Sequence, residues 1–192
     1  MRATSGAKRY ITSRAASGVA VLAILLLAGV ERTQAAEIIP SVGWSRPVDG
    51  DEAKISGGVA FRGDLLPILK DEIAVSYRSD SQMDGLLRVR QWPITASLWL
   101  QPVPSLYAGG GVGFYHMTLD YDQDRIPLAI QDETREEFGV HLGGGLRVPL
   151  APTAALDLGG RYVMMRDQES RLVPQKFDPD FWNASVGLAF HF

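Results

Sequence analysis

The sequence predicts an all-β fold, an eight-stranded antiparallel up-and-down β-barrel that crosses a membrane and follows a cleaved signal peptide. Three observations support this prediction. Apolar residues alternate with small or polar ones along eight segments, which is the two-residue period of strands with one apolar face. The connections between segments are short on one side and long on the other, as in membrane barrels. Aromatic residues recur near one end of the apolar faces, where a bilayer has its interface.

Residues 1–36 are predicted to be the secretory signal peptide. Four basic residues and no acidic one precede the 13-residue apolar run from Gly18 to Val30, and small residues follow at Thr33, Ala35 and Ala36. A helix needs about 20 apolar residues to cross a bilayer, so this run is short for a permanent span. We therefore expect export of the chain, with residues 37–192 forming one β-barrel domain.

Composition excludes several partners and sites. The 192-residue chain has no cysteine, so a disulfide framework, a cysteine metal site and a cysteine lipid anchor are all excluded. Five of 19 basic and one of 22 acidic residues precede Glu37, which leaves the predicted domain a formal charge of −7. That charge disfavours nucleic acid as a partner. We expect no metal site and no cofactor.

The first four predicted strands span residues 38–44, 53–62, 72–78 and 86–100. Their alternation is regular, and the polar face that carries Lys54 and Arg62 belongs in water or in a wet barrel interior. The nine-residue link between the second and third strands is longer than the short connections expected on its side. Pro93 has no backbone N–H group to donate to a neighbouring strand, so we expect a bulge or other irregularity there.

The other four predicted strands span residues 106–119, 138–150, 156–164 and 181–192. Residues 138–150 alternate most cleanly, with Phe138, Val140 and Leu142 in opposite phase to His141 and Arg147. A three-residue turn of sequence APT, residues 151–153, follows this strand, whereas 120–136 and 165–180 are predicted as long loops. The last strand has an apolar residue at every second position and finishes on an aromatic one.

The apolar faces are predicted to meet lipid. Seven strands then contribute one aromatic residue each to a single rim, which we call the aromatic girdle: Trp44, Tyr77, Trp92, Phe114, Phe138, Tyr162 and Trp182. Phe61, Phe190 and Phe192 fall at the opposite rim. A soluble barrel, which is the alternative, would turn its apolar face inward and would not need these rows.

Polar residues of the opposite phase are predicted to fill the interior. They include a polar network of Glu72, Arg78, His141, Arg147, Asp157 and Arg161. Eight strands leave room inside for side chains and little else, so buried charges must pair. We expect Glu72 and Asp157 to pair with Arg78, Arg147 and Arg161 and to plug the barrel. A polar pore for small solutes is the alternative.

These features resemble the small outer-membrane β-barrel proteins of the OmpA-transmembrane-domain, OmpX and OmpW type. The resemblance covers the signal peptide, the eight strands, the glycine-rich segments YAGGGVGFYH, FGVHLGGGLRVPL and LDLGGRYV, and the terminal phenylalanine. It implies a monomer in the outer membrane of a Gram-negative envelope. It also implies that the barrel assembly machinery recognises the last strand through Phe192, Phe190, Leu188 and Val186.

Charged residues beyond the girdle are candidate lipid contacts. Arg88 and Arg90 share the phase of Trp92, at the height of lipopolysaccharide headgroups, where guanidinium groups suit phosphates. A solvated loop face is the alternative. The acidic segment that starts at Asp120 resembles a calcium loop but has Arg125 where an EF-hand needs glycine, so an EF-hand is excluded. Loose bridging of this segment to lipid phosphates by divalent cations is a minor alternative.

We expect a structural or surface-interaction role and no enzymatic activity, with outer-membrane lipid and lipopolysaccharide as partners. Two alternatives stay open. A narrow channel for small hydrophobic molecules would resemble the OmpW type. A lipid A-modifying enzyme would use His116, which lies near the outer rim, although no histidine has a neighbouring hydroxyl and acid in sequence that complete a triad.

Overall fold

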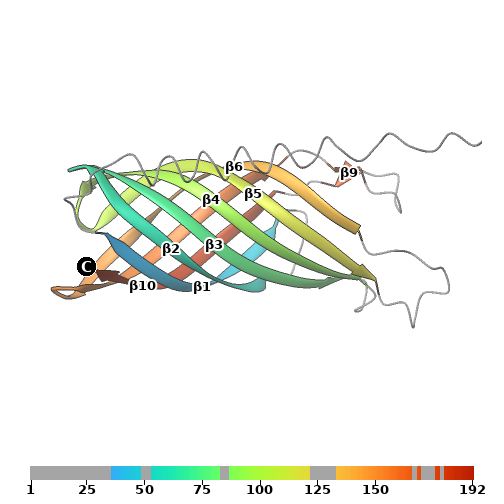
Figure 1. Ribbon diagram of the computed structural model, residues 1–192, viewed down its shortest axis with the longest axis horizontal. Coiled ribbons are helices and arrows are strands. Elements are labelled where there is room, and N and C mark those ends of the chain that lie inside the picture. The colour runs from blue at the N-terminus through green and yellow to red at the C-terminus, as the bar shows by residue number, and fades with distance from the viewer. Residues whose placement is uncertain are drawn as a thin grey trace, which may run out of the picture. The chain divides into compact units, whose positions relative to one another are not determined.

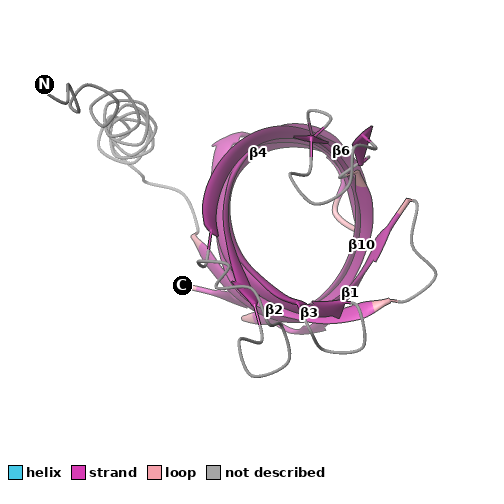
Figure 2. Ribbon diagram, turned by 90° about the vertical axis from the view of Figure 1, so that its right-hand side faces the viewer, coloured by secondary structure: helices cyan, strands magenta, loops and turns pink. Residues whose placement is uncertain are grey.

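The computed structural model describes residues 36–48, 53–82, 87–121, 133–165, 168–169, 176–177 and 180–192. The predicted signal peptide lies outside this range except for Ala36. Eight long strands close into an antiparallel barrel in the order β1-β10-β7-β6-β5-β4-β3-β2 (Figure 1). The view along the barrel shows the closed ring (Figure 2). Among the described residues, no helix has the length and apolarity needed to cross a membrane.

The fold class and the eight predicted strands are confirmed. Seven of the strands reach beyond their predicted ends, and the last one stops a residue earlier. The strands are β1 (Glu37–Pro47), β2 (Lys54–Leu66), β3 (Leu69–Gln82), β4 (Leu87–Val103), β5 (Leu106–Tyr121), β6 (Glu133–Ala151), β7 (Ala154–Met165) and β10 (Phe181–His191).

The link between β2 and β3 is shorter than predicted. The strands continue through Asp64 and Lys70, which lie opposite each other and form an ion pair. Only Pro67 and Ile68 remain as a turn, instead of nine residues. Residues 67–68, 104–105 and 152–153 therefore form three tight turns at one end of the barrel, the turn end. The connections after β1, β3, β5 and β7 mark the other end, the loop end.

Of the bulge or other irregularity expected at Pro93, the structure has a local gap in the ladder and no bulge. Pro93 pairs with Tyr115 on β5 in an unbroken register. On the β3 side, pairing passes from Val75 opposite Ile94 to Arg78 opposite Gln91, also without a shift. The missing donor therefore interrupts the ladder locally and leaves the register intact. The register shifts of β4 and its neighbours fall beside the turns, where strands bend most.

One short element was missed in the segment predicted as an irregular loop. Gln168–Glu169 (β8) and Lys176–Phe177 (β9) pair antiparallel as a small separate sheet. Strands of two residues are too short to show a periodic pattern. The acidic segment considered for divalent cations falls mainly on residues 122–132, outside the described residues.

The barrel carries its apolar side chains outside. Val42, Leu142 and Trp182 are 59%, 61% and 59% exposed, whereas the inward-facing Trp99 and Tyr115 are each 1% exposed. A soluble protein does not present such a continuous apolar surface to water. The arrangement fits a lipid environment, and the alternative of a soluble barrel with an apolar interior is wrong.

Inward-facing glycines make room for large inward side chains. A Cβ atom on Gly113 or Gly139 would lie 2.7 Å or 3.0 Å from the Tyr115 ring. A Cβ on Gly145 would meet the Tyr107 hydroxyl and the Leu158 carbonyl oxygen. The rings of Tyr107 and Tyr115 thus lie against backbone positions that have no side chain of their own.

Gly145→Val is expected to destabilise the barrel by about 1–3 kcal/mol, because the new side chain overpacks against Tyr107. Gly160→Val is the matched control, since a Cβ there meets nothing within 4 Å. Urea unfolding followed by tryptophan fluorescence measures both variants. Equal unfolding midpoints would contradict the packing role of Gly145.

Candidate functional site

A cluster of buried charges crosses the interior toward the turn end. Arg62 donates from Nε and Nη2 to Glu72 Oε2 at 3.0 Å and 2.7 Å, and from Nη1 to Asp157 Oδ2 at 2.8 Å. Arg161 Nη2 donates to Glu72 Oε1 at 2.5 Å. The Tyr107 hydroxyl donates to Asp157 Oδ1 at 2.6 Å. Two guanidinium groups thus neutralise two carboxylates, and we call these five residues the ionic floor.

Aromatic rings pack against the ionic floor. The Cζ atom of Arg62 lies 4.5 Å from the centre of the Tyr107 ring, and that of Arg161 lies 5.1 Å from the Trp99 ring. Trp99 and Tyr107 meet edge to face at 5.4 Å. The rings keep water away from the cations while their π-faces attract them. The floor is therefore a layer of paired charges and rings, with a small cavity of about 30 Å³ beside it.

A second ionic cluster joins the first and last strands of the barrel. Arg147 Nη2 donates to Glu37 Oε2 at 2.5 Å, and His191 Nδ1 lies 3.3 Å from Glu37 Oε1. Glu37 belongs to β1, His191 to β10 and Arg147 to β6 across the interior. The cluster therefore supports the β1–β10 seam from inside.

The predicted polar network is inside the barrel, but its partners differ in part from those expected. The pair of Glu72 with Arg161 is present. Arg147 lies opposite Asp157 in the β6–β7 register yet bonds to Glu37, so the expected pair with Asp157 is wrong. Asp157 pairs with Arg62 instead. Arg78 lies nearer the loop end, with its Cζ atom 4.4 Å from the centre of the Phe181 ring.

Glu37 and Tyr107 are interior partners that the sequence pattern did not predict. Glu37 precedes the predicted first strand by one residue, and extending the alternation back by that residue would have placed it inward. Tyr107 belongs to the inward-facing residues of its strand, but it has no charge that would indicate an ionic partner. Both are at most 4% exposed.

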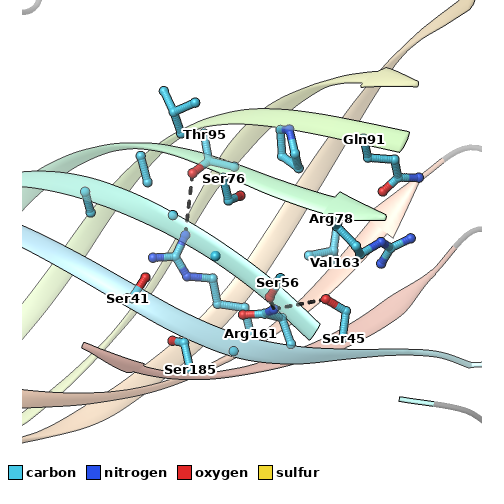
Figure 3. A pocket seen from close by; sticks show the side chains of 18 of the residues that line it. Ser41, Ser45, Ser56, Ser76, Arg78, Gln91, Thr95, Arg161, Val163 and Ser185 are labelled. Atoms are coloured by element: carbon cyan, nitrogen blue, oxygen red, sulfur yellow. Dashed lines mark hydrogen bonds between the residues drawn. The ribbon is translucent and has the colours of Figure 1, made fainter. Parts of the chain in front are cut away.

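Between the ionic floor and the loop end lies a cavity of about 100 Å³ (Figure 3). Its lining includes five serines on β1, β2, β3 and β10, which we call the serine wall: Ser41, Ser45, Ser56, Ser76 and Ser185. Asn183 Nδ2 donates to Ser45 Oγ at 3.2 Å and to Ser56 Oγ at 3.3 Å. At the loop end, Tyr115 and Phe181 meet edge to face at 6.2 Å.

The histidines do not form a triad among the described residues. His141 Nε2 lies 2.9 Å from Ser97 Oγ, but both residues are buried in the interior. His116 Nδ1 lies 3.8 Å from Glu136 Oε1 on the outer face. A hydrolytic site needs a hydroxyl group and a carboxylate on the same histidine. Here His141 has the hydroxyl partner and His116 has the carboxylate partner.

The outer face carries the seven residues of the aromatic girdle toward the loop end. Trp44 and Trp92 are each 50% exposed and Phe138 is 52% exposed, whereas Phe114 and Tyr162 are half-buried. Two pairs stack at tilted angles, Tyr77 with Trp92 at 4.6 Å and Tyr162 with Trp182 at 4.7 Å.

The predicted assembly signal lies toward the turn end, on the outer face of β10 and on Phe192, the residue after it. Its members are exposed: Phe192, Phe190, Leu188 and Val186. Phe61 lies near Phe190, because both pair with Ile38 on β1.

Arg90 faces outward two residues beyond Trp92, because the register through Pro93 does not shift. Arg46, which sequence analysis did not single out, stands in the same relation to Trp44 on β1 and is also exposed. The side chain of Arg88 lies outside the described part of the chain.

Comparisons with known proteins agree with this architecture. The family model described as outer membrane protein beta-barrel domain matches residues 20–192. Neisserial surface protein A is 15% identical, with a TM-score of 0.61 over 83% of this chain and 97% of that one. OprG from Pseudomonas aeruginosa is 16% identical, with a TM-score of 0.55 over 84% and 97%. Among curated proteins, no sequence match was found.

A third similar structure is that of Ail, the attachment invasion locus protein of Yersinia pestis, in complex with the heparin analogue sucrose octasulfate. It is 16% identical, with a TM-score of 0.54 over 83% of this chain and 99% of that one. Likenesses at these identities show a shared fold.

Glu72→Ala is expected to destabilise the barrel by about 3–5 kcal/mol, because Arg62 and Arg161 lose their shared carboxylate in a buried setting. Glu136→Ala is the control, since its pair with His116 is exposed and worth about 0–1 kcal/mol. Urea titration of the lipid-reconstituted protein reports both. If the two variants lose the same small amount of stability, the ionic floor does not hold the barrel.

Proposed function

The chain belongs to the family of outer membrane protein beta-barrel domains, and we propose that it has a structural or surface-interaction role in the outer membrane, with a plugged interior. The observation that carries this proposal is the ionic floor, in which Glu72 and Arg62 are 1% and 3% exposed. The charges there are mutually neutralised and packed against rings. Such a layer supports the strands and leaves recognition to the surface.

The two alternative functions have less support. A channel for small hydrophobic molecules would have to pass them between charged and hydroxyl-bearing side chains, which apolar cargo does not solvate. A lipid A-modifying enzyme would need His116 to have a nucleophile or an activated water, and its described ion-pair partner is Glu136 alone. Neither alternative explains the packed charges of the interior.

Planar-bilayer recording tests the plugged interior. The purified barrel, inserted into a lipid bilayer, is expected to give no reproducible single-channel steps, because the paired charges of the ionic floor cross the interior. Insertion is verified by the change of electrophoretic mobility on heating. Conductance steps of constant amplitude, whose number rises with the amount of inserted protein, would favour transport.

We propose that Arg90 and Arg88, together with Arg46, contact lipopolysaccharide phosphates just beyond the aromatic girdle. Arg90 and Arg46 are exposed. Each lies two residues nearer the loop end than a girdle tryptophan on the same strand, Trp92 for Arg90 and Trp44 for Arg46. Lipid A is a partner of fitting chemistry, since guanidinium groups bind phosphate through paired hydrogen bonds.

Arg46→Gln with Arg90→Gln is expected to reduce the stabilisation that lipid A gives the barrel in thermal unfolding, because two of the three proposed contacts are removed. The wild type should unfold at a higher temperature in vesicles containing lipid A than in vesicles of phosphatidylcholine, and lipid A without phosphates should give no increase. An equal increase in the wild type and the double variant would rule out these contacts.

We also propose that barrel assembly machinery recognises the last strand and that residues 1–36 are removed as a signal peptide. The intact mass of protein isolated from the outer membrane measures the cleavage. Phe192, Phe190, Leu188 and Val186 form one exposed apolar row that such machinery could bind.

Phe192→Ser is expected to reduce the amount of folded barrel in the outer membrane several-fold without abolishing refolding into detergent. Phe61→Ser is the control, because Phe61 is an exposed aromatic residue at the same rim, 52% exposed, on β2. Heat-modifiable mobility of membrane fractions measures both. Undiminished assembly of the Phe192 variant would contradict the signal.

A further inference from the structure

The cavity beside the serine wall is lined by small side chains on one side and by larger ones on the other. Opposite the small serines stand larger side chains, among them Thr95, His141 and Arg161. Gln91 and Arg78 lie toward one end of the cavity (Figure 3). The small residues on one wall leave open space that the large residues on the other wall do not fill.

The buried polar atoms at this cavity that have no hydrogen-bond partner among the described residues include His141 Nδ1 and Gln91 Oε1. Both residues line the cavity, and they are 1% and 4% exposed. Their other polar atoms are engaged, since His141 Nε2 meets Ser97 Oγ and Gln91 Nε2 lies 2.7 Å from Met117 Sδ. A buried polar atom without a partner is unfavourable, so these two atoms indicate an occupant.

The two atoms restrict what the occupant can be. Gln91 Oε1 accepts hydrogen bonds only, so the occupant must donate one. Serine hydroxyls donate and accept, and suit a partner that does the same. An apolar molecule would leave both atoms unpaired, and a fully ionised sulfate has no proton to give to Gln91. Two arginines line the cavity. Arg161 is already neutralised by Glu72 at 2.5 Å, which weakens its attraction for a free anion, and the Arg78 guanidinium lies over the Phe181 ring, 4.4 Å from its centre.

We propose that this cavity is a binding site for neutral O–H groups, supplied by a cluster of water molecules or by one small polyol of about the size of glycerol. A volume of about 100 Å³ has room for several waters or one such molecule. His141 Nδ1, Gln91 Oε1 and the serine wall supply the hydrogen-bonding groups.

The site has a neighbouring layer on each side along the barrel. The ionic floor lies toward the turn end, and the buried pair of Tyr115 and Phe181 lies toward the loop end. The proposal does not depend on the surface role of the protein.

Nuclear magnetic resonance of the His141 ring tests the site. The barrel, with its histidines labelled with ¹⁵N, is refolded into micelles in water alone and with rising concentrations of glycerol, sodium sulfate or benzene. The chain has three histidines, so a His141→Phe sample assigns the signal. We expect magnetisation transfer from water to the ring in the first sample.

The glycerol series separates the two sources of O–H groups. A saturable shift of the His141 signal identifies a polyol site, and water transfer unchanged by glycerol identifies a water cluster. Both results support the proposal. A ring with neither contact, or one that responds to sulfate or benzene instead, overturns it.

Gln91→Met keeps the size of the side chain and removes the acceptor. It is expected to weaken the glycerol response about five- to tenfold, the effect of losing one hydrogen bond, or to reduce the water transfer if water is the occupant. Gln101→Met is the matched control. Gln101 Oε1 is also buried without a described partner, but Gln101 does not line the cavity. Equal responses of the two variants, both folded by heat-modifiable mobility, would overturn the role of Gln91.

Discussion

The pairing of β1 with β10 is the contact on which the rest of the structure depends. Lipid offers no hydrogen bonds to a free strand edge, so a sheet can cross a membrane only when its first and last strands close the ladder. Nine residue pairs from Glu37 with His191 to Pro47 with Phe181 make that closure. The Glu37, Arg147 and His191 cluster supports the same seam from the inside. Backbone closure and interior charge therefore stabilise one another.

The closed ladder gives the barrel an outer face and an inner face of opposite polarity. With lipid outside, the residues of one phase form an apolar surface, and those of the other phase must satisfy their polar groups within a narrow interior. The barrel does this in two layers. Toward the turn end, carboxylates and guanidinium groups neutralise one another and pack against rings. Toward the loop end, the hydroxyl groups of the serine wall surround open space. The interior therefore changes along the barrel from an ionic layer to the cavity beside the serine wall.

The sequence contained the phase of each strand but not the partners of each charge. The alternation placed Glu72, His141 and Arg147 inside and Trp44 and Trp182 outside, because a two-residue period depends only on neighbours along the chain. Arg147 bonds to Glu37, 110 residues away, because a long guanidinium reaches past its cross-strand neighbour and across the interior. That reach depends on the stagger and diameter of the closed barrel, which no local pattern contains. The cavity depends on the same geometry.

Tryptophan quenching by brominated lipids tests most directly whether the apolar phase faces lipid. The chain has four tryptophans, so four variants that each retain one of them, with phenylalanine at the other positions, can be compared in vesicles. The variants that retain Trp44, Trp92 or Trp182 are expected to be quenched strongly, since these side chains are 50–59% exposed. The variant that retains Trp99, which is 1% exposed inside the barrel, should be quenched little. Strong quenching of Trp99 and weak quenching of the other three would contradict the account.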